Sequence, residues 1–377
     1  MKFTCSTKPL QNALKLGVIK SNISKFYQKS CLAKITCTQD TMKVNLEASR
    51  IVTQLKLHGS GDEDGPASVF IDCQVFNDLV NTFDSDVVTV EFVEGGIVLH
   101  AGKSKFTLPK VIDDSDDADL DLAAPQELDQ NAIYKSIDLK AENWKFINDH
   151  QMFAIAINYI HPVYCRVWVG ENDDVLVGDY DNSVFTHSTK GSLGRTCLLP
   201  PTIINLFTSL PEGSKLIDTG SSYIVKVVTD GYEYVTEFMP ELESDENVGS
   251  YNSEVFMGLF SNKEKSVTID VPKVTKFLNQ ATYVLTAYDS LLDFVVSGDS
   301  IYIGSDVVNC NLVPEGENNC ENFECRFKAN FLKFVFSALD SEKVNIAPTF
   351  SGEGEEREVA GVLFWTDNMS VLLGAVE

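Results

Sequence analysis

This sequence contains few histidines and none of the common catalytic motifs. Its five histidines form no ligand-spaced pair, and no nucleophile elbow, phosphate-binding loop, HExxH zinc motif or dinucleotide fingerprint occurs. Nowhere do about 18 apolar residues follow one another, and no apolar signal-peptide core follows Lys2. We therefore expect a soluble, cytoplasmic protein that is not an enzyme, contacts no membrane and uses no cofactor.

Cysteine is present but forms no dense framework. The nine cysteines are odd in number and scattered along the chain, which suits a reducing compartment better than a secreted one. Cys320 and Cys325 are close in sequence, yet no second cysteine pair or histidine set follows at zinc spacing. The sequence thus predicts free thiols and no metal site.

Positive charge is also scarce. There are 30 Lys and Arg residues against 55 Asp and Glu residues, which gives a formal charge of −25. A body this acidic is repelled by the phosphate backbone, and this argues at first sight against nucleic acid as a partner. The conclusion depends on where the lysines lie, and therefore on the order of the structural elements.

A repeated α+β unit dominates the sequence. Most helix candidates follow a strand-like segment, and strand-like segments broken by hairpin-type turns come after them. Aspartates at or near the N-cap and prolines in the first turn support these helix starts. Successive helices begin 56 to 71 residues apart, which indicates six copies of one β-α-β-β-β unit. The expected helices are 8–20, 73–83, 140–151, 201–210, 272–283 and 328–339.

Two acidic stretches group the six units into pairs. Residues 113–121 separate the second unit from the third, and residues 241–250 separate the fourth from the fifth. A metal site could in principle use the first of these stretches, but a flexible run rarely offers the fixed geometry that a metal needs. The aspartates in question are Asp113, Asp114, Asp116 and Asp117. We predict three domains of two units each, at 1–121, 122–246 and 247–377.

The helical spans carry positive charge in an otherwise acidic chain. They contain nine lysines and only three acidic residues. Lys8 and Lys15, with Gln11 or Asn12, fall on the side of the first helix opposite its apolar residues, and Lys276 is placed similarly. We expect each helix to present a lysine face; ordinary solvation of surface helices is the alternative. Lysines attract phosphates without reading bases, so a protein that uses them can slide along DNA.

Several stretches resemble the bacterial-type sliding clamp family, the DNA polymerase III beta subunit. No single motif is diagnostic, and the resemblance depends on the order of parts over nearly the whole chain. Its landmarks are Met1-Lys2-Phe3-Thr4, Leu10-Gln11-Asn12-Ala13-Leu14, Phe76-Asn77-Asp78-Leu79-Val80, residues 102–109, Pro200-Pro201-Thr202-Ile203-Ile204-Asn205-Leu206 and residues 270–278.

The resemblance implies three tandem DNA-clamp domains, each a pair of βαβββ units, with helices lining a ring and antiparallel sheets outside. It implies a homodimer that encircles double-stranded DNA independently of sequence and binds a DNA polymerase and a clamp loader. Lys20 and Tyr164 fall where or near where the family contacts DNA. The predicted DNA-facing residues are Lys8, Lys15, Lys20, Lys140, Lys145, Tyr164, Lys273, Lys276 and Lys333.

The family also has an apolar groove for partner peptides. The stretch Asp181-Asn182-Ser183-Val184-Phe185 keeps the Asp and the apolar end of the family's turn, and the ending Leu373-Gly374-Ala375-Val376-Glu377 departs from it. This departure is what a virus-encoded clamp acting in an infected host cell would show, and a bacterial origin is the alternative. The predicted groove residues are Tyr180, Val184, Phe185, Pro240, Val248, Val371 and Leu373.

Two other functions compete with a processivity clamp. One is an acidic interaction protein, such as a DNA mimic that inhibits a DNA-binding partner; it predicts a monomer, and the lysines on the helices count against it. The other is a hydrolase with a cryptic carboxylate pair, which would need acidic residues clustered in a pocket. The mass of the protein in solution separates the first two.

Overall fold

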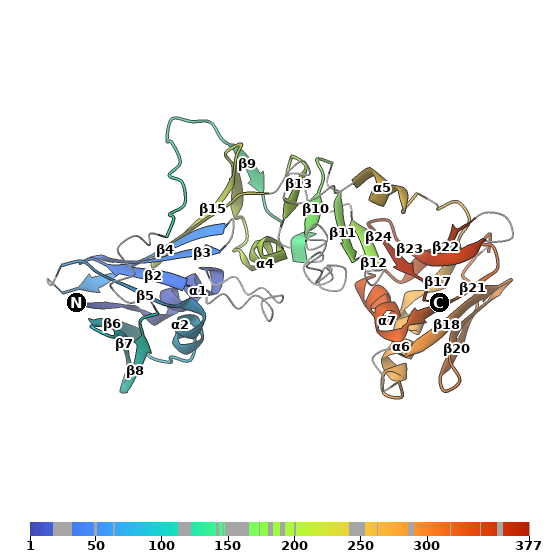
Figure 1. Ribbon diagram of the computed structural model, residues 1–377, viewed down its shortest axis with the longest axis horizontal. Helices are drawn as coiled ribbons and strands as arrows, with labels where there is room; N and C mark the ends of the chain where they lie inside the picture. Colours follow the sequence, from blue (N-terminus) through green and yellow to red (C-terminus); the bar gives the residue numbers. More distant parts are fainter. Residues whose placement is uncertain are drawn as a thin grey trace. The chain divides into compact units, whose positions relative to one another are not determined.

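The structure is a computed structural model, and its secondary structure is drawn in Figure 1. It describes residues 1–17, 32–48, 51–62, 65–111, 122–140, 143–145, 147, 166–172, 174–179, 184–188, 193–199, 201–240, 253–261, 263–285, 290–316, 318–339, 341–352 and 357–376. The chain forms two compact units, 1–141 with 205–240 and 142–204 with 241–377.

The predicted β-α-β-β-β order is present along the chain, and with it the α+β class is confirmed. The first two copies lie in the first compact unit. Copy one is β1 (Lys2–Ser6), α1 (Thr7–Gly17), β2 (Leu32–Cys37), β3 (Thr41–Ala48) and β4 (Ile51–Gly61). Copy two is β5 (Ala67–Asp72), α2 (Cys73–Val80), β6 (Val87–Val93), β7 (Gly96–Ala101) and β8 (Ser104–Pro109).

The third and fourth copies are shared between the two compact units. Copy three contains β9 (Lys135–Asp138), helical residues 143–145 and 147, β10 (Val167–Val169), β11 (Val175–Asp179) and β12 (Val184–Ser188). Copy four contains β13 (Cys197–Leu199), α4 (Pro201–Ser209), β14 (Lys215–Asp218), β15 (Tyr223–Val228) and β16 (Tyr232–Phe238).

The last two copies lie in the second compact unit, after a short helix α5 (Ser253–Gly258). Copy five is β17 (Val267–Asp270), α6 (Val271–Ala281), β18 (Leu291–Ser297), β19 (Ser300–Gly304) and β20 (Asn309–Leu312). Copy six is β21 (Phe323–Lys328), α7 (Ala329–Ala338), β22 (Lys343–Ser351), β23 (Glu358–Trp365) and β24 (Met369–Gly374).

Local sequence explains the helix starts. Asp72 accepts a hydrogen bond from the backbone N–H of Val75 at 3.0 Å, and Asp270 accepts one from Lys273 at 2.8 Å, so both aspartates are N-caps as predicted. Pro272 occupies the first turn of α6, where no helical N–H is lost. Asp138 likewise ends a strand, β9, but the described helical residues of that copy begin only at Asn143.

The two copies of each pair are joined by the same two strand pairings in all three pairs. β1 pairs with β6 and β2 with β5; β9 pairs with β14 and β10 with β13; β17 pairs with β22 and β18 with β21, all antiparallel. The helices of a pair also pack on each other, α1 against α2 and α6 against α7. The two copies of each pair are therefore linked by the same strand pairings, and the division into three domains stays a prediction.

Neighbouring modules join through their last strands. β4 pairs with β16 over seven residue pairs, and β12 pairs with β24 over five, both antiparallel. The first join builds a 12-stranded sheet in the first compact unit, and the second builds an 8-stranded sheet in the second; β18–β21 form a separate 4-stranded sheet. The joins explain why residues 205–240 group with the amino-terminal part of the chain.

Candidate functional site

Helix α1 separates charge from core along its length. Lys8, Asn12 and Lys15 are exposed, and Leu10 and the apolar residues beside it are buried. The sequence left open whether Gln11 or Asn12 shares the lysine face, and the structure selects Asn12.

Gln11 has a different task. It is buried, and its Nε2 donates to the carbonyl oxygens of Val80 and Phe83, each at 3.0 Å. These bonds satisfy carbonyl groups at the end of α2, and so they fasten the two helices to each other.

Helix α6 repeats this arrangement with two lysines in different electrostatic states. Lys273 Nζ lies 3.1 Å from the Asp270 carboxylate, whose pKa is lowered mainly by the hydrogen bond from the Lys273 backbone N–H. Lys276 is exposed and makes no ion pair with any described residue. Lys333 on α7 donates to Thr282 Oγ1 at 3.2 Å, beyond the end of α6. Lys276 is therefore the cation of this module most available to a ligand.

The expectation that every helix presents lysines needs correction. Helix α2 exposes Val75 and Asp78, and α4 contains no charged residue. Lys140 and Lys145, near the described helical residues of the third copy, are exposed. The lysines therefore concentrate on the first helix of each pair. Lys20 and Tyr164 lie outside the described residues.

The predicted groove residues divide between the two faces of one sheet. In the β12–β24 join, Val184 is opposite Leu373, Phe185 is opposite Leu372, and Thr186 is opposite Val371. Successive side chains alternate across a sheet, so Val184, Val371 and Leu373 share one face and Phe185 lies on the other. Tyr180 and Val248 lie outside the described residues, and Pro240 is buried in the first compact unit.

Phe185 belongs to an apolar cluster that we call the outer cluster. Its members are Trp168, Leu176, Phe185, Leu198, Phe260, Ala347, Leu363, Trp365 and Leu372, with Met257 and Leu259 packed against it. Phe260 stacks near His187 with ring centroids 5.5 Å apart. Lys263 donates to Ser370 Oγ at 2.9 Å, and burial lowers its pKa.

The residues after α5 contribute to this cluster, which the sequence pattern did not predict. The apolar residues Val255, Met257, Leu259 and Phe260 directly follow an acidic stretch that we assigned to a linker. That change in composition was a signal that the chain returns to the body of the protein. The face bearing Phe185 is thus already covered by Met257, Leu259 and Phe260.

Among the strands that end the described sheets, two are the last strands of their copies, β8 and β20. The Lys110 N–H donates to the Gly95 carbonyl, and the Ser305 N–H donates to the Val308 carbonyl, so Gly95/Lys110 and Ser305/Val308 are hydrogen-bonded pairs. Hydrogen-bonded and non-hydrogen-bonded pairs alternate along an antiparallel hairpin, and these two pairs therefore set the pattern for β7–β8 and β19–β20. The backbone groups of Lys105 and Thr107 on β8 therefore point away from β7. Those of Asn309 and Asn311 on β20 likewise point away from β19.

These two edges differ in charge. Lys103 and Lys105 are exposed at the β8 edge, where Phe106 is also 37% exposed. Asp306 is exposed at the β20 edge, beside Val307 at 66%. The β8 edge therefore exposes two lysines, whereas the turn that leads into β20 exposes one aspartate, and both places also expose an apolar side chain.

Catalytic chemistry finds no support in the described part of the chain. No three His, Cys, Asp or Glu side chains gather there as a metal would require. Burial raises the pKa of the Cys5 and Cys37 thiols to about 12, so these cysteines are inert core residues. None of the described helices is both long and apolar enough to cross a bilayer.

Repeated β-α-β-β-β copies joined edge to edge through their last strands are the arrangement of sliding-clamp folds. No protein-family model and no curated protein matches the chain. Solved structures do. It matches DNA polymerase III beta subunit from Thermotoga maritima with a TM-score of 0.72 and 10% identity, covering 100% of this chain and 99% of that one.

Two further structures agree with this match. The DNA polymerase sliding clamp from Bacillus subtilis gives 0.69 and 15% identity over 100% and 99% of the chains. The Helicobacter pylori beta clamp bound to a DNA ligase peptide gives 0.64 and 14% over 100% of both. The fold of this chain is therefore that of the bacterial DNA polymerase III beta subunit, over its whole length.

Proposed function

We propose that this chain is a DNA polymerase processivity factor, a sliding clamp that encircles duplex DNA and holds the replicative polymerase on it. The observation that carries the proposal is the sixfold β-α-β-β-β repeat with its two edge-to-edge joins, in a chain whose fold matches sliding clamps from end to end. Such a protein works by topology and binding, and it needs no catalytic group. We further propose three clamp domains, at 1–121, 122–246 and 247–377.

The charge distribution supports contact with DNA through the helices. Exposed Lys8 and Lys15 on α1 and Lys276 on α6 lie on short helices in a protein of charge −25. Point charges on flexible stems attract phosphates and do not select bases, so the protein keeps hold of DNA and still moves along it. The acidic remainder of the surface disfavours DNA binding elsewhere.

Unpaired edges support closure of the ring by a second copy. Within the chain, last strands of neighbouring modules pair twice, β4 with β16 and β12 with β24. The two last strands left over are β8 and β20, whose outward backbone groups, exposed apolar side chains and opposite charges complement each other. Pairing β8 of one copy with β20 of another, twice, gives a head-to-tail homodimer in which the last strand of every β-α-β-β-β copy is paired on both sides.

Partner binding would use the outer cluster. Phe185, the one predicted groove residue on that face, is surrounded by Trp168, Trp365 and Leu372. A polymerase or clamp-loader peptide with apolar side chains would dock beside these residues, against the segment that contains Leu259 and Phe260. The protein would work in the cytoplasm of a bacterium, or of an infected host cell if it is virus-encoded.

Two measurements test the proposal. The mass in solution should be twice that of the chain, and protein loaded on nicked circular DNA should be lost when the circle is linearised. A monomer that competes with DNA for basic proteins would instead indicate an acidic DNA mimic. Equal retention on circular and linear DNA would exclude encirclement.

A further inference from the structure

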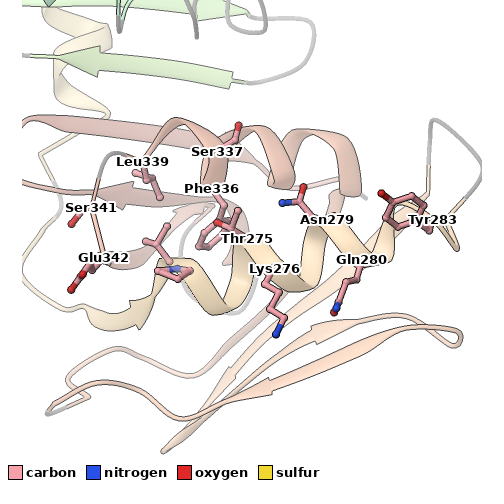
Figure 2. Close-up of a pocket in the computed structure, with 12 residues that line it drawn as sticks. Thr275, Lys276, Asn279, Gln280, Tyr283, Phe336, Ser337, Leu339, Ser341 and Glu342 are labelled. Carbon is pink, nitrogen blue, oxygen red and sulfur yellow. The ribbon is translucent and has the colours of Figure 1, made fainter. Parts of the chain in front are cut away.

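A shallow groove lies between α6 and α7. It is open to solvent and has a volume of about 870 Å³. Val271, Pro272, Phe336 and Leu339 line one end, where the carboxylate of exposed Glu342 also lies (Figure 2). The other end is polar and basic.

Four side chains of α6 and the turn after it make up that basic end. Lys276, Asn279, Gln280 and Tyr283 are spaced as i, i+3, i+4 and i+7, so they form one stripe about 10 Å long on the helix. All four are exposed, and Tyr283 is 88% exposed. Figure 2 shows the Lys276 and Gln280 side chains extending from the same side of α6. We call these four residues the α6 stripe.

The α6 stripe combines an aromatic ring, a positive charge and two amides. The ring of Tyr283 is 88% exposed, which leaves it open to a stacking partner. Lys276 adds a positive charge that no described residue neutralises, whereas Lys273, one turn earlier, is paired with Asp270. The two amides between them offer both hydrogen-bond donors and acceptors.

We propose that the α6 stripe binds a single unpaired strand of DNA, with a phosphate at Lys276 and a base stacked on Tyr283. A cation, amides and an exposed aromatic ring in one line are the features that single-strand binding needs, since every base has a π-face and every linkage a phosphate. Glu342 at the far end repels phosphate, which directs the backbone toward Lys276. The apolar floor then lies next to the bases.

This inference rests on the proposed function, because it takes DNA as the ligand. A clamp at the end of a primer meets duplex DNA and the unpaired template strand next to it. Lysines such as Lys8 and Lys15 attract the phosphates of duplex DNA equally well at every position along it. Tyr283 adds a contact that only an unpaired base can make, so the α6 stripe would distinguish the junction from continuous duplex.

The test measures binding of a fluorescein-labelled oligothymidylate and of a duplex of the same length by anisotropy, over a salt series. Tyr283→Ala should weaken single-strand binding about 5- to 100-fold and leave the duplex unchanged, and Tyr283→Phe should bind as the parent does. Lys276→Ala should reduce the slope of log K against log salt by about 0.7 for the single strand.

Two control variants test whether a loss of single-strand binding is specific to the α6 stripe. Val284→Ala removes a neighbouring side chain that is 55% exposed and does not line the groove, and Lys265→Ala removes a lysine already paired with Glu321 at 2.9 Å. Both should bind the single strand as the parent does. Equal losses for Tyr283→Ala on single strand and duplex, or no loss on either, would overturn the inference, as would an acidic peptide that displaces the oligonucleotide more readily than DNA does.

Failure of the inference and failure of the proposed function give different results. If the parent protein is retained on circular DNA and Tyr283→Ala leaves single-strand binding intact, the clamp function stands and the α6 stripe is not a strand site. If circular DNA does not retain the parent but single-strand binding still needs Tyr283, the α6 stripe is a strand site and the clamp function is wrong.

Discussion

Thr53 and Thr236 share a buried hydrogen bond, 2.8 Å between their hydroxyl oxygens, across the β4–β16 join. They are 183 residues apart in sequence and directly opposite in the sheet, and each is at most 2% exposed. Ser222 and Gln126 bond to the buried carboxylate of Glu237 beside them, each at 2.6 Å. The join between modules is therefore a specific polar contact inside an apolar sheet.

This contact predicts a particular pattern of stability. Thr53→Val leaves the Thr236 hydroxyl without its side-chain partner in the core and should lower the free energy of unfolding by about 1–3 kcal/mol. Replacing both threonines by valine removes both hydroxyls together, so the loss in the double variant should be smaller than the sum of the two single losses. Urea unfolding of the parent, both single variants and the double variant measures the coupling; additive losses would show that the hydroxyls do not interact.

Reversing the charge of the helix lysines should weaken retention on DNA. Lys15→Glu with Lys276→Glu removes two unpaired cations from the proposed lining, and dissociation from nicked circular DNA should become faster and less dependent on salt. The matched control is Lys265→Glu with Lys343→Glu, which changes net charge equally at two lysines already paired with glutamates. If both double variants dissociate alike, the assignment of the helices to DNA is wrong.

A substitution on the β8 edge should separate the proposed dimer without disturbing the fold of the single chain. Thr107→Pro removes an N–H that points away from β7, so the intrachain ladder keeps its bonds while pairing with a second copy loses one. The mass in solution should fall to that of one chain. Thr107→Val keeps the N–H and should remain dimeric; a dimeric Thr107→Pro protein would mean that β8 is not the interface.

Phe185→Ala should reduce binding of peptides from the partner polymerase by about 30-fold, which corresponds to about 2 kcal/mol, because it removes an aromatic side chain from the cluster beside which such a peptide would dock. Retention on circular DNA should change little. Val184→Ala is the control, because Val184 lies in the same strand and faces the opposite side of the sheet. Both variants lose core packing, so binding is compared at a temperature where circular dichroism shows each to be folded. Similar affinities for the two variants would exclude the outer cluster.

The cap of α6 predicts a dependence of stability on pH. The pKa of Asp270 is lowered in the folded protein, so its ionised form stabilises the fold fully above the ordinary pKa of 3.8. This stabilisation is lost as the pH falls through the lowered, folded-state pKa. Asp270→Asn keeps an N-cap oxygen but carries no charge. The difference in unfolding free energy between parent and variant should therefore shrink between roughly pH 5 and pH 2; a constant difference would contradict the assignment.

The repeat was readable from the sequence because each copy carries its own local signals. Asp72 and Asp270 are caps, Pro272 begins a helix, and strands alternate with period two whether or not the rest of the chain is present. Local free energies thus determined the elements, their order and the α+β class.

What only the tertiary structure decided is which residues meet. Thr53 with Thr236, and Phe185 with Leu372, are brought together by long-range pairing whose register no local pattern encodes. A shift of one residue in the β12–β24 join would place Phe185, and not Val184, on the face of Val371 and Leu373, so no local pattern decides which of the two shares their face. For the same reason local sequence could not assign Gln11 to the core or assemble the α6–α7 groove, since both depend on how two helices distant in sequence pack.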